Sequence, residues 1–163
     1  MSKRVIFLDR DGVINRERGE YTYRLEDVEW VTDLFESLKI FKDHGFEFIV
    51  ISNQGGVAKG IYSMEDVMAI QNAFEEELSK HDLKLLDHYY CPHHQDFTNC
   101  LCRKPKSNML ERAIAKHDID AGASYFIGDS ERDVQAGEAL NVRSFKVSAN
   151  HSILELSKSI CND

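Results

Sequence analysis

Two carboxylates follow the first apolar stretch of this sequence at a spacing that suits metal-assisted chemistry. In VIFLDRDGVIN, residues 5–15, four apolar residues lead into Asp9, Asp11 and then Gly12. Carboxylates at close quarters repel each other and shift each other's pKa values. A hard cation relieves this repulsion, and magnesium is typically held by one or two carboxylates together with phosphate oxygens of a substrate. The pattern therefore indicates a magnesium site that handles a phosphorylated ligand.

Two later apolar runs also end in polar clusters. The run FIVI leads into Ser52 and Asn53, and the run YFIG leads into Asp129, with Asp133 four positions later. The Ser52 hydroxyl and the backbone amides of SNQGG, residues 52–56, could donate hydrogen bonds to an anionic oxygen. These clusters therefore supply candidate groups for the same ligand.

Two cations, Arg103 and Lys104, could offset the charge of a phosphoryl group. They stand shortly before a helix expected over residues 108–117, and the N-terminus of a helix itself favours anions. Most lysines are simply solvated, so the expectation for Lys104 depends on the other groups beside it.

These residues are positioned by apolar runs that alternate with segments of helical periodicity. Strands are expected over residues 5–8, 46–51, 88–91, 125–127 and 144–147, and helices over 33–45, from 63, over 108–117 and 131–140, and from about 152. Alternating strands and helices imply a parallel sheet with helices on both faces. The carboxyl ends of parallel strands share one edge, where open α/β sheets bind ligands. Asp9, Asp11, Ser52 and Asp129 should therefore converge at that edge.

Capping-box spacing marks three of the expected helix starts. The pairs are Asp33 with Glu36, Ser63 with Asp66, and Ser130 with Asp133. In such a box the acidic side chain accepts a hydrogen bond from the backbone of the capping residue. Asp133 therefore has two candidate roles, because it can support the metal site or cap its own helix, and both roles can hold together.

A second set of metal-binding side chains lies in YYCPHHQDFTNCLCRKP, residues 89–105. Three cysteines stand there with an imidazole from one of two histidines: Cys91, Cys100 and Cys102, with His93 or His94. Three thiolates and one imidazole make a tetrahedral zinc site with no open position, which is typical of structural zinc. The competing interpretation is a loop of reduced, buried thiols.

Composition limits the size, compartment and partners. The chain has 163 residues, is 42% hydrophobic and 29% charged, and carries a formal net charge of −8, as a single globular domain over residues 1–163 would. We expect no membrane segment, because there is no long apolar run, and a cytoplasmic location, because the N-terminus lacks the features of a signal peptide. The four cysteines, including Cys161, should then be reduced. The acidic balance disfavours nucleic acid as a partner.

Together these motifs resemble the haloacid dehalogenase superfamily of phosphatases. The four motifs of that superfamily occur in order over roughly residues 4–147, and they match Asp9, Asp11 and Gly12, then Ser52, then Lys104, and finally Gly128, Asp129 and Asp133. The resemblance implies a Rossmann-like, doubly wound α/β sheet. It also implies magnesium-dependent hydrolysis of a phosphomonoester through an aspartyl-phosphate intermediate.

The same resemblance assigns roles to individual residues. It makes Asp9 the nucleophile and Asp11 the general acid and base, with the Asp11 backbone carbonyl as a magnesium ligand. It makes Asp129 a further magnesium ligand, and it leaves open whether Asp133 supports the magnesium site or only caps its own helix. The side chains implied to hold phosphoryl oxygens are those of Ser52, Asn53 and Lys104.

The cysteine-rich loop resembles one branch of the superfamily. This zinc-loop branch contains histidinol-phosphate phosphatases and D-glycero-D-manno-heptose 1,7-bisphosphate phosphatases, which carry C-P-H, a variable loop and C-x-C-R-K-P, as residues 91–105 do. The resemblance favours His93 over His94 as the fourth zinc ligand. The site should be essentially capless, because no insertion is long enough for a cap domain and residues 16–31 are the one other candidate flap.

Two cations beside the phosphoryl site bear on the substrate. Lys59 stands where the heptose enzymes also carry a basic residue, and Lys59 or Arg103 could hold a second phosphate. We therefore expect heptose 1,7-bisphosphate 7-phosphatase activity, with histidinol-phosphate phosphatase activity as the alternative. Residues 19–22, GEYT, replace the Gly-Tyr-Val of the heptose enzymes, which leaves the sugar contacts open.

Two classes of protein that are not enzymes share part of this pattern. A phospho-acceptor signalling domain also places an aspartate, a hydroxyl residue, a lysine and magnesium on an α/β sheet, but Asp11 in the D-x-D-G turn favours turnover. A zinc-loop module that binds nucleic acid is disfavoured by the charge of −8 and by the lack of a basic, aromatic-rich segment. The expected partner is a small phosphorylated metabolite, and the expected state is a monomer.

Overall fold

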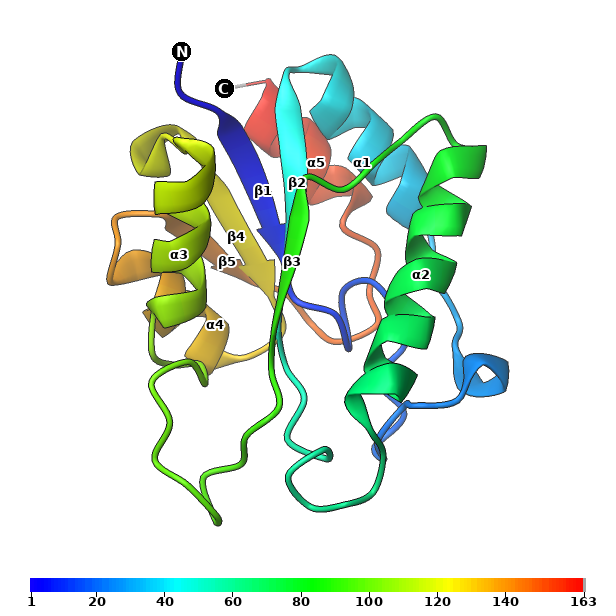
Figure 1. The fold of residues 1–163 in the computed structure, drawn as a ribbon. Coiled ribbons are helices and arrows are strands. Elements are labelled where there is room, and N and C mark those ends of the chain that lie inside the picture. The colour runs from blue at the N-terminus through cyan, green and yellow to red at the C-terminus, as the bar shows by residue number, and fades with distance from the viewer. Residues whose placement is uncertain (163) are drawn as a thin grey trace.

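The computed structural model describes residues 1–162, which form one parallel sheet of five strands with helices on both of its faces (Figure 1). The strand order is β3-β2-β1-β4-β5. In chain order the elements are β1 (Arg4–Leu8), a 3-10 turn η1 (Leu25–Asp27), α1 (Leu34–Asp43), β2 (Phe46–Asn53), α2 (Met64–Lys80), β3 (Asp87–Cys91), α3 (Asn108–His117), a 3-10 turn η2 (Ala121–Ala123), β4 (Tyr125–Gly128), α4 (Glu131–Glu138), β5 (Arg143–Lys146) and α5 (Leu154–Cys161). The predicted doubly wound α/β sheet is confirmed.

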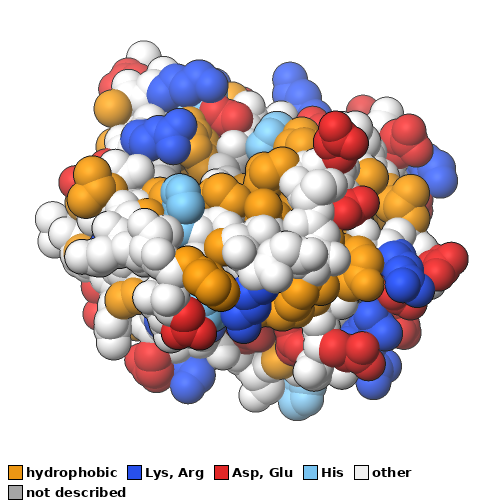
Figure 2. Space-filling model, turned by 60° about the horizontal axis from the view of Figure 1, so that its bottom comes forward, with side chains coloured by type: hydrophobic (Ala, Val, Ile, Leu, Met, Phe, Trp, Pro, Cys, Tyr) orange, Lys and Arg blue, Asp and Glu red, His pale blue; other side chains and the backbone are white. Residues whose placement is uncertain are grey.

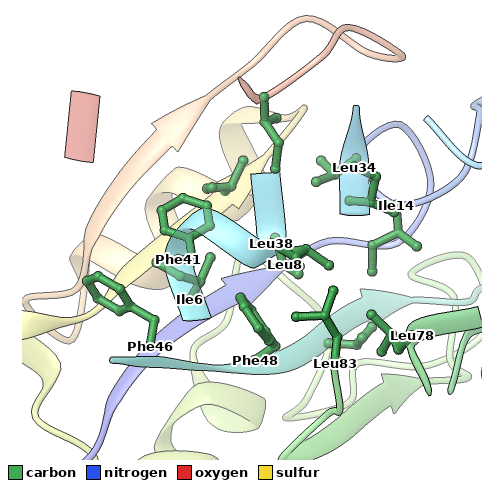
Figure 3. Close-up of a cluster of buried hydrophobic side chains, with 14 of the residues drawn as sticks. Ile6, Leu8, Ile14, Leu34, Leu38, Phe41, Phe46, Phe48, Leu78 and Leu83 are labelled. Carbon is green, nitrogen blue, oxygen red and sulfur yellow. The ribbon is translucent and has the colours of Figure 1, made fainter. Parts of the chain in front are cut away.

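The sheet separates two apolar cores. Ile6 and Leu8 of β1 pack into the core beneath α1, α2 and α5, which Figure 3 shows with Leu38 and Phe41 of α1. Val5 and Phe7 of the same strand belong to the core beneath α3 and α4. Successive side chains of a strand point to opposite faces, so a strand covered on both faces reads as a continuous apolar run.

All strand pairs in the sheet are parallel, so the carboxyl ends of the strands lie along one edge, at the bottom of Figure 1. Strand β2 runs to Asn53, two residues beyond its predicted end, which places Ser52 inside the strand. No second sheet or helical cap stands over this edge within residues 1–162. None of the helices in that part of the chain is long and apolar enough to cross a membrane.

The capping predictions hold at two of the three helix starts. Capping boxes are present at Ser63 before α2 and at Ser130 before α4. The prediction for α1 is wrong, because Asp33 adopts a left-handed conformation with φ of 63° and makes no side-chain cap hydrogen bond. Its carboxylate instead accepts a hydrogen bond from the Ser152 hydroxyl at 2.8 Å. A contact between distant parts of the chain has replaced the local cap.

Candidate active site

A cavity of about 510 Å³ opens at the carboxyl edge of the sheet, which faces the viewer in Figure 2. The predicted site residues that line it are Asp9, Asp11, Asn53, Arg103, Lys104, Asp129 and Asp133. The predicted convergence of the aspartates is thus confirmed, although they come from the ends of β1 and β4. On the face shown in Figure 2, acidic, basic and hydrophobic side chains are interspersed.

Three carboxylates crowd the floor of this cavity around one lysine. Asp9, Asp129 and Asp133 each offer an oxygen within 4.8 Å of the others. The Lys104 Nζ donates to Asp9 Oδ1 at 3.0 Å and to Asp133 Oδ1 at 2.6 Å, and its side chain is 3% exposed. Three negative charges and one positive charge leave a net negative site in a buried setting.

This crowding shifts the acidity of two of the carboxyls. Burial raises the pKa of Asp9, and the charge of Lys104 opposes that rise while Asp133 and Asp129 add to it. Burial and the neighbouring Asp133 also raise the pKa of Asp129. A divalent cation between Asp9 and Asp129 would stabilise both ionised forms. The donor set therefore fits magnesium, which prefers oxygen ligands.

Asp133 has both of its oxygens bound by other parts of the protein. Its Oδ1 accepts from Lys104, and its Oδ2 accepts from the Ser130 backbone amide at 3.2 Å. The helix-capping role of Asp133 is therefore real, and the same side chain also holds Lys104. Gly128 makes room for it, because a Cβ at that position would lie 2.3 Å from the Asp133 Cβ.

Gly12 lets the turn after β1 approach the carboxylate of Asp129. A Cβ on Gly12 would lie 2.2 Å from Asp129 Oδ2, far inside contact distance. The φ of Gly12 is +93°, in the region that residues with a side chain rarely adopt. Both space and backbone conformation therefore require glycine in the D-x-D-G turn.

Side chains that the sequence analysis did not single out hold Asp11. Arg10 Nη2 and Asn15 Nδ2 donate to Asp11 Oδ1 at 3.1 and 2.9 Å, and Gln54 Nε2 donates to Oδ2 at 3.0 Å. Tyr62, the next member of this network, donates its hydroxyl to Gln54 Oε1 at 2.6 Å. Arg10 lies within DRDG and Gln54 within SNQGG, so these two were visible in the sequence, whereas Asn15 and Tyr62 lie outside both motifs. The burial and partners of all four depend on the tertiary structure.

Two predicted phosphate-binding residues lie outside the lining of the cavity. Ser52 is buried, 1% exposed, and its hydroxyl accepts from Gln54 Nε2 at 3.0 Å. Lys59 is exposed, and its Nζ stands 5.4 Å from the centre of the Tyr21 ring. Because Tyr21 lines the cavity, Lys59 lies at the rim, while Ser52 lies behind the floor.

The flap segment, residues 16–31, forms one wall of the cavity. The residues of this segment that line the cavity are Glu17, Gly19, Glu20, Tyr21 and Thr22. The loop after β5 holds the start of the segment, because Asn150 accepts from the Glu17 amide at 2.6 Å and donates to the Glu17 carbonyl at 2.9 Å. The segment expected as a candidate flap therefore contributes directly to the site.

Three thiols and one imidazole converge in the loop after β3. The four predicted zinc ligands each offer an atom within 4.8 Å of the others: Cys91, His93, Cys100 and Cys102. Sγ–Sγ distances are 3.7 Å from Cys91 to Cys100 and 3.1 Å from Cys91 to Cys102, and His93 Nδ1 lies 3.5 Å from the Cys91 sulfur. Ligands on a zinc tetrahedron with bonds of about 2.3 Å lie about 3.8 Å apart. The set fits zinc.

The second histidine of the loop points elsewhere. His94 Nδ1 accepts from the Asp96 amide at 3.2 Å, outside the converging set.

The protein environment shifts the acidity of two of the thiols in this set. Burial raises the pKa of the Cys91 thiol. At Cys100, burial is outweighed by hydrogen bonds from the backbone amides of Arg103 and Cys102, which lower the thiol pKa to about 7. A partly ionised thiol is suited to binding a metal.

The cysteine loop also places the two cations of the site. The Arg103 amide donates to Cys100 Sγ at 3.4 Å, and Arg103 Nη1 donates to the His93 carbonyl at 3.0 Å. The Lys104 amide donates to Asn53 Oδ1 at 3.0 Å, and Asn53 Nδ2 donates back to the Lys104 carbonyl at 3.1 Å. Asn53 therefore ties the end of β2 to the loop that carries Arg103 and Lys104.

Comparison with known proteins identifies the family. A family model described as "HAD-hyrolase-like" matches residues 101–155. A D-glycero-alpha-D-manno-heptose-1,7-bisphosphate 7-phosphatase from Photorhabdus laumondii is 37% identical over 159 residues, which cover 93% of this chain and 86% of that protein. The chain belongs to the heptose bisphosphate phosphatase family. It is a phosphatase of the haloacid dehalogenase superfamily, so the phospho-acceptor interpretation is not supported.

One further relative agrees with this assignment, and a solved structure shares the fold. The protein of the same name from Campylobacter jejuni is 39% identical over 137 residues, which cover 84% of this chain and 77% of that protein. A crystal structure of D,D-heptose 1.7-bisphosphate phosphatase from B. bronchiseptica, complexed with magnesium and phosphate, has a TM-score of 0.84, with 24% identity and coverage of 96% of this chain and 86% of that chain. That likeness shows that the family fold is shared.

Proposed function

We propose that this family member hydrolyses the C7 phosphate of D-glycero-D-manno-heptose 1,7-bisphosphate through an aspartyl-phosphate intermediate. The observation that carries the chemistry is the cavity in which Asp9 lies beside Asp129 and Lys104, with Asp11 two residues away in the same turn. The names of the relatives described above support the substrate. The proposed reaction needs a nucleophile, a proton donor and groups that stabilise the phosphoryl charge, and the cavity supplies each of them.

In the proposed reaction Asp9 attacks phosphorus and Asp11 gives its proton to the departing alkoxide. Asp11 then takes a proton from water, which attacks the aspartyl phosphate and releases inorganic phosphate. Lys104 and the Arg10 backbone amide both donate to Asp9 Oδ1, at 3.0 and 2.9 Å, and these bonds limit rotation of the nucleophile. Holding the reacting groups in place removes much of the entropic barrier.

We propose Asp9, Asp129 and the Asp11 carbonyl as the magnesium ligands. When bound, magnesium would neutralise charge that develops on the phosphoryl oxygens. We assign Asp133 to positioning Lys104, because both of its oxygens already accept hydrogen bonds. Lys104, Arg103 and Asn53 would hold the phosphoryl oxygens, and Ser52 would act from behind the cavity floor through Gln54.

Asp129→Asn should stabilise the protein in a chelating buffer and abolish its stabilisation by magnesium. Because the pKa values of Asp9 and Asp129 are raised, their ionisation costs folding energy that grows as pH rises above the ordinary carboxyl range. Removing one of these charges should raise Tm at neutral pH by a few degrees at most, because Asp129 is partly exposed and solvent screens its charge. Thermal unfolding with EDTA and then with magnesium measures both effects.

The matched control is Glu131→Gln, which removes a carboxylate from the exposed first turn of α4. This variant should keep the magnesium-dependent rise in Tm, which follows from binding to the folded state alone. A magnesium response that survives in Asp129→Asn would contradict the assignment of this ligand.

Removal of the metal should also stop the reaction. EDTA should stop hydrolysis by the unmodified protein and magnesium should restore it.

The cations of the site suit a substrate with a second phosphate. Arg103 lines the cavity, and Lys59 stands at its rim beside Tyr21. An anchor that binds a non-reacting phosphate contributes binding energy that positions the reacting one. Lys59→Ala should therefore lower kcat/KM for the heptose bisphosphate by roughly tenfold, with a smaller effect on a small monophosphate.

Steady-state kinetics at two salt concentrations test this role. Lys59 is exposed, so salt screens its charge, and the difference between the wild type and Lys59→Ala should shrink at high salt. Lys158→Ala, which removes an exposed lysine from α5, is the control and should leave kcat/KM unchanged. Equal losses on the bisphosphate and the monophosphate would refute a second-phosphate anchor at Lys59.

Histidinol phosphate remains the second candidate substrate, because the wall of the cavity carries acidic and aromatic groups. Glu17, Glu20 and Tyr21 line it, and such groups suit an amine and an imidazole. The decisive comparison measures kcat/KM for histidinol phosphate and for the heptose bisphosphate under the same conditions. A higher value for histidinol phosphate would overturn the first choice and leave the phosphatase chemistry in place.

A further inference from the structure

Both oxygens of the Asp11 carboxylate are bound by ordered donors. Arg10 and Asn15 donate to Oδ1, and Gln54 Nε2 donates to Oδ2 at 3.0 Å. Oδ1 already accepts from both Arg10 and Asn15, whereas Oδ2 accepts one hydrogen bond and keeps a further position. The donors therefore fix the plane of the carboxyl and leave Oδ2 free to hold the transferred proton. The plane decides in which direction a proton can leave.

The orientation of the Gln54 amide depends on Tyr62. The Gln54 NH2 group donates to Asp11 Oδ2 and to the Ser52 hydroxyl, so the Gln54 oxygen faces the other way. That oxygen accepts from the Tyr62 hydroxyl at 2.6 Å, and Gln54 is 2% exposed. Burial raises the pKa of Tyr62 to about 12, so the hydroxyl stays protonated and donates at neutral pH.

The ring of Tyr62 is held by the flap segment. Tyr23 stacks on it with ring centres 5.4 Å apart and an angle of 9°, and Tyr21 meets it edge-on at 5.7 Å and 61°. The ring also lies against Gly56, where a Cβ would come within 2.1 Å of Tyr62 Cε1. The ring therefore fits a slot that admits little movement.

A second connection runs from the flap segment to the same carboxylate. Arg10 Nη2 donates both to the Thr22 carbonyl at 2.8 Å and to Asp11 Oδ1 at 3.1 Å. Figure 1 shows the flap segment, in blue, beside the first turns of α2. Residues 21–23 thus meet both routes that lead to Asp11, one through Tyr62 and Gln54 and one through Arg10.

We propose that Gln54 and Tyr62 are positioning residues that orient Asp11 for proton transfer to the leaving oxygen, and that residues 21–23 of the flap segment set this orientation. The inference rests on the proposed function, in which Asp11 is the general acid. As the bond between phosphorus and the leaving oxygen breaks and the bond to Asp9 forms, the Asp11 proton moves to that oxygen. A misoriented carboxyl makes this transfer slower without preventing attack by Asp9.

The test compares the loss of rate on two substrates whose leaving groups differ in their need for a proton. A nitrophenolate is stable as an anion and needs no proton as it leaves, whereas an alkoxide needs one. General acid catalysis contributes roughly 10²–10⁴-fold. Tyr62→Phe, which keeps the ring and removes the hydroxyl, should therefore lower kcat/KM by about tenfold or more for an alkyl phosphate and by less than about threefold for p-nitrophenyl phosphate. The value of kcat/KM reports the first phosphoryl transfer and omits the later hydrolysis of the intermediate.

Three further variants make the outcome decisive. Gln54→Met keeps a side chain of similar size but removes the hydrogen bonds to Asp11, Ser52 and Tyr62, and it should show the same selective loss. Tyr125→Phe removes a tyrosine hydroxyl at the amino end of β4, away from the cavity, and should change neither rate. Asp11→Asn should show the largest loss on the alkyl phosphate, because it removes the proton itself.

The control for the test is Asp11→Asn, which should lose more activity on the alkyl phosphate than on p-nitrophenyl phosphate. If it does, the inference is overturned when Tyr62→Phe and Gln54→Met both show equal losses on the two substrates or no loss on either. If Asp11→Asn does not discriminate, then Asp11 is not the general acid and the proposed function fails at that step. Thermal unfolding of each variant shows whether a loss of activity reflects a loss of folded protein.

Discussion

Asp9→Asn should lower turnover by at least about a thousandfold while the protein stays folded. The amide cannot attack phosphorus as a carboxylate does, so no aspartyl phosphate would form. Its oxygen can still accept the hydrogen bonds that Asp9 Oδ1 receives from Lys104 and the Arg10 amide. The substitution also removes one of the crowded negative charges, so we expect no loss of Tm in a chelating buffer.

The same chemical change on the surface serves as the control. Asp43→Asn removes an exposed carboxylate that pairs with Lys39 on α1, and such surface changes usually alter stability by no more than about 0.5 kcal/mol. Single-turnover release of phosphate by the two variants, with magnesium present, separates chemistry from product release. Activity of Asp9→Asn within about tenfold of the wild type would rule out Asp9 as the nucleophile.

Cys100→Ser should remove zinc from the protein and lower its Tm. The protein as isolated should hold about one zinc per chain, since zinc bound at a site that forms on folding contributes to the folding energy. A loss of even about 2 kcal/mol corresponds to about 4–8 °C in a domain of this size. Turnover should fall as well, because the Arg103 amide donates to Cys100 Sγ and the loop leads into Lys104.

The chain offers matched controls for this substitution. Cys161→Ser changes a half-buried cysteine in the last turn of α5, outside the metal-binding set. His94→Ala removes the competing imidazole, while His93→Ala removes the one that converges with the thiols. Metal analysis should find zinc in Cys161→Ser and in His94→Ala, and little zinc in His93→Ala. A full complement of zinc in Cys100→Ser, or none in the unmodified protein, would exclude the proposed site.

The core elements were predictable because each has a local cause. Strands β1, β2 and β4 read as apolar runs because both of their faces are buried. Ser63 and Ser130 cap their helices through partners three residues away. Their parallel arrangement then places Asp9 and Asp129 at one edge without further information. The three cysteines of the proposed zinc site were equally visible, because clustered thiols and an imidazole favour a metal, whereas the choice of His93 over His94 came from the family resemblance.

Several features of the site could not be predicted, because they depend on packing between distant segments. Asp33 has a good local capping partner, yet its carboxylate binds Ser152 from the other end of the chain. Ser52 directly follows an apolar run, but the strand continues through it and buries it behind the cavity floor. Both outcomes depend on contacts between segments that are distant in the sequence, which the local spacing of residues does not record.

The sequence by itself indicated the fold class, the acidic groups that meet at one edge of the sheet and the cysteine-rich cluster that we propose binds zinc. Each of these follows from periodicity or from motif spacing, which are properties of neighbouring residues. Only the tertiary structure decided that Asp133 holds Lys104 as well as its own helix, and that Gln54, Tyr62 and the flap segment surround Asp11. Buried polar groups must find partners, and which partners are within reach is settled only when the loops pack against one another.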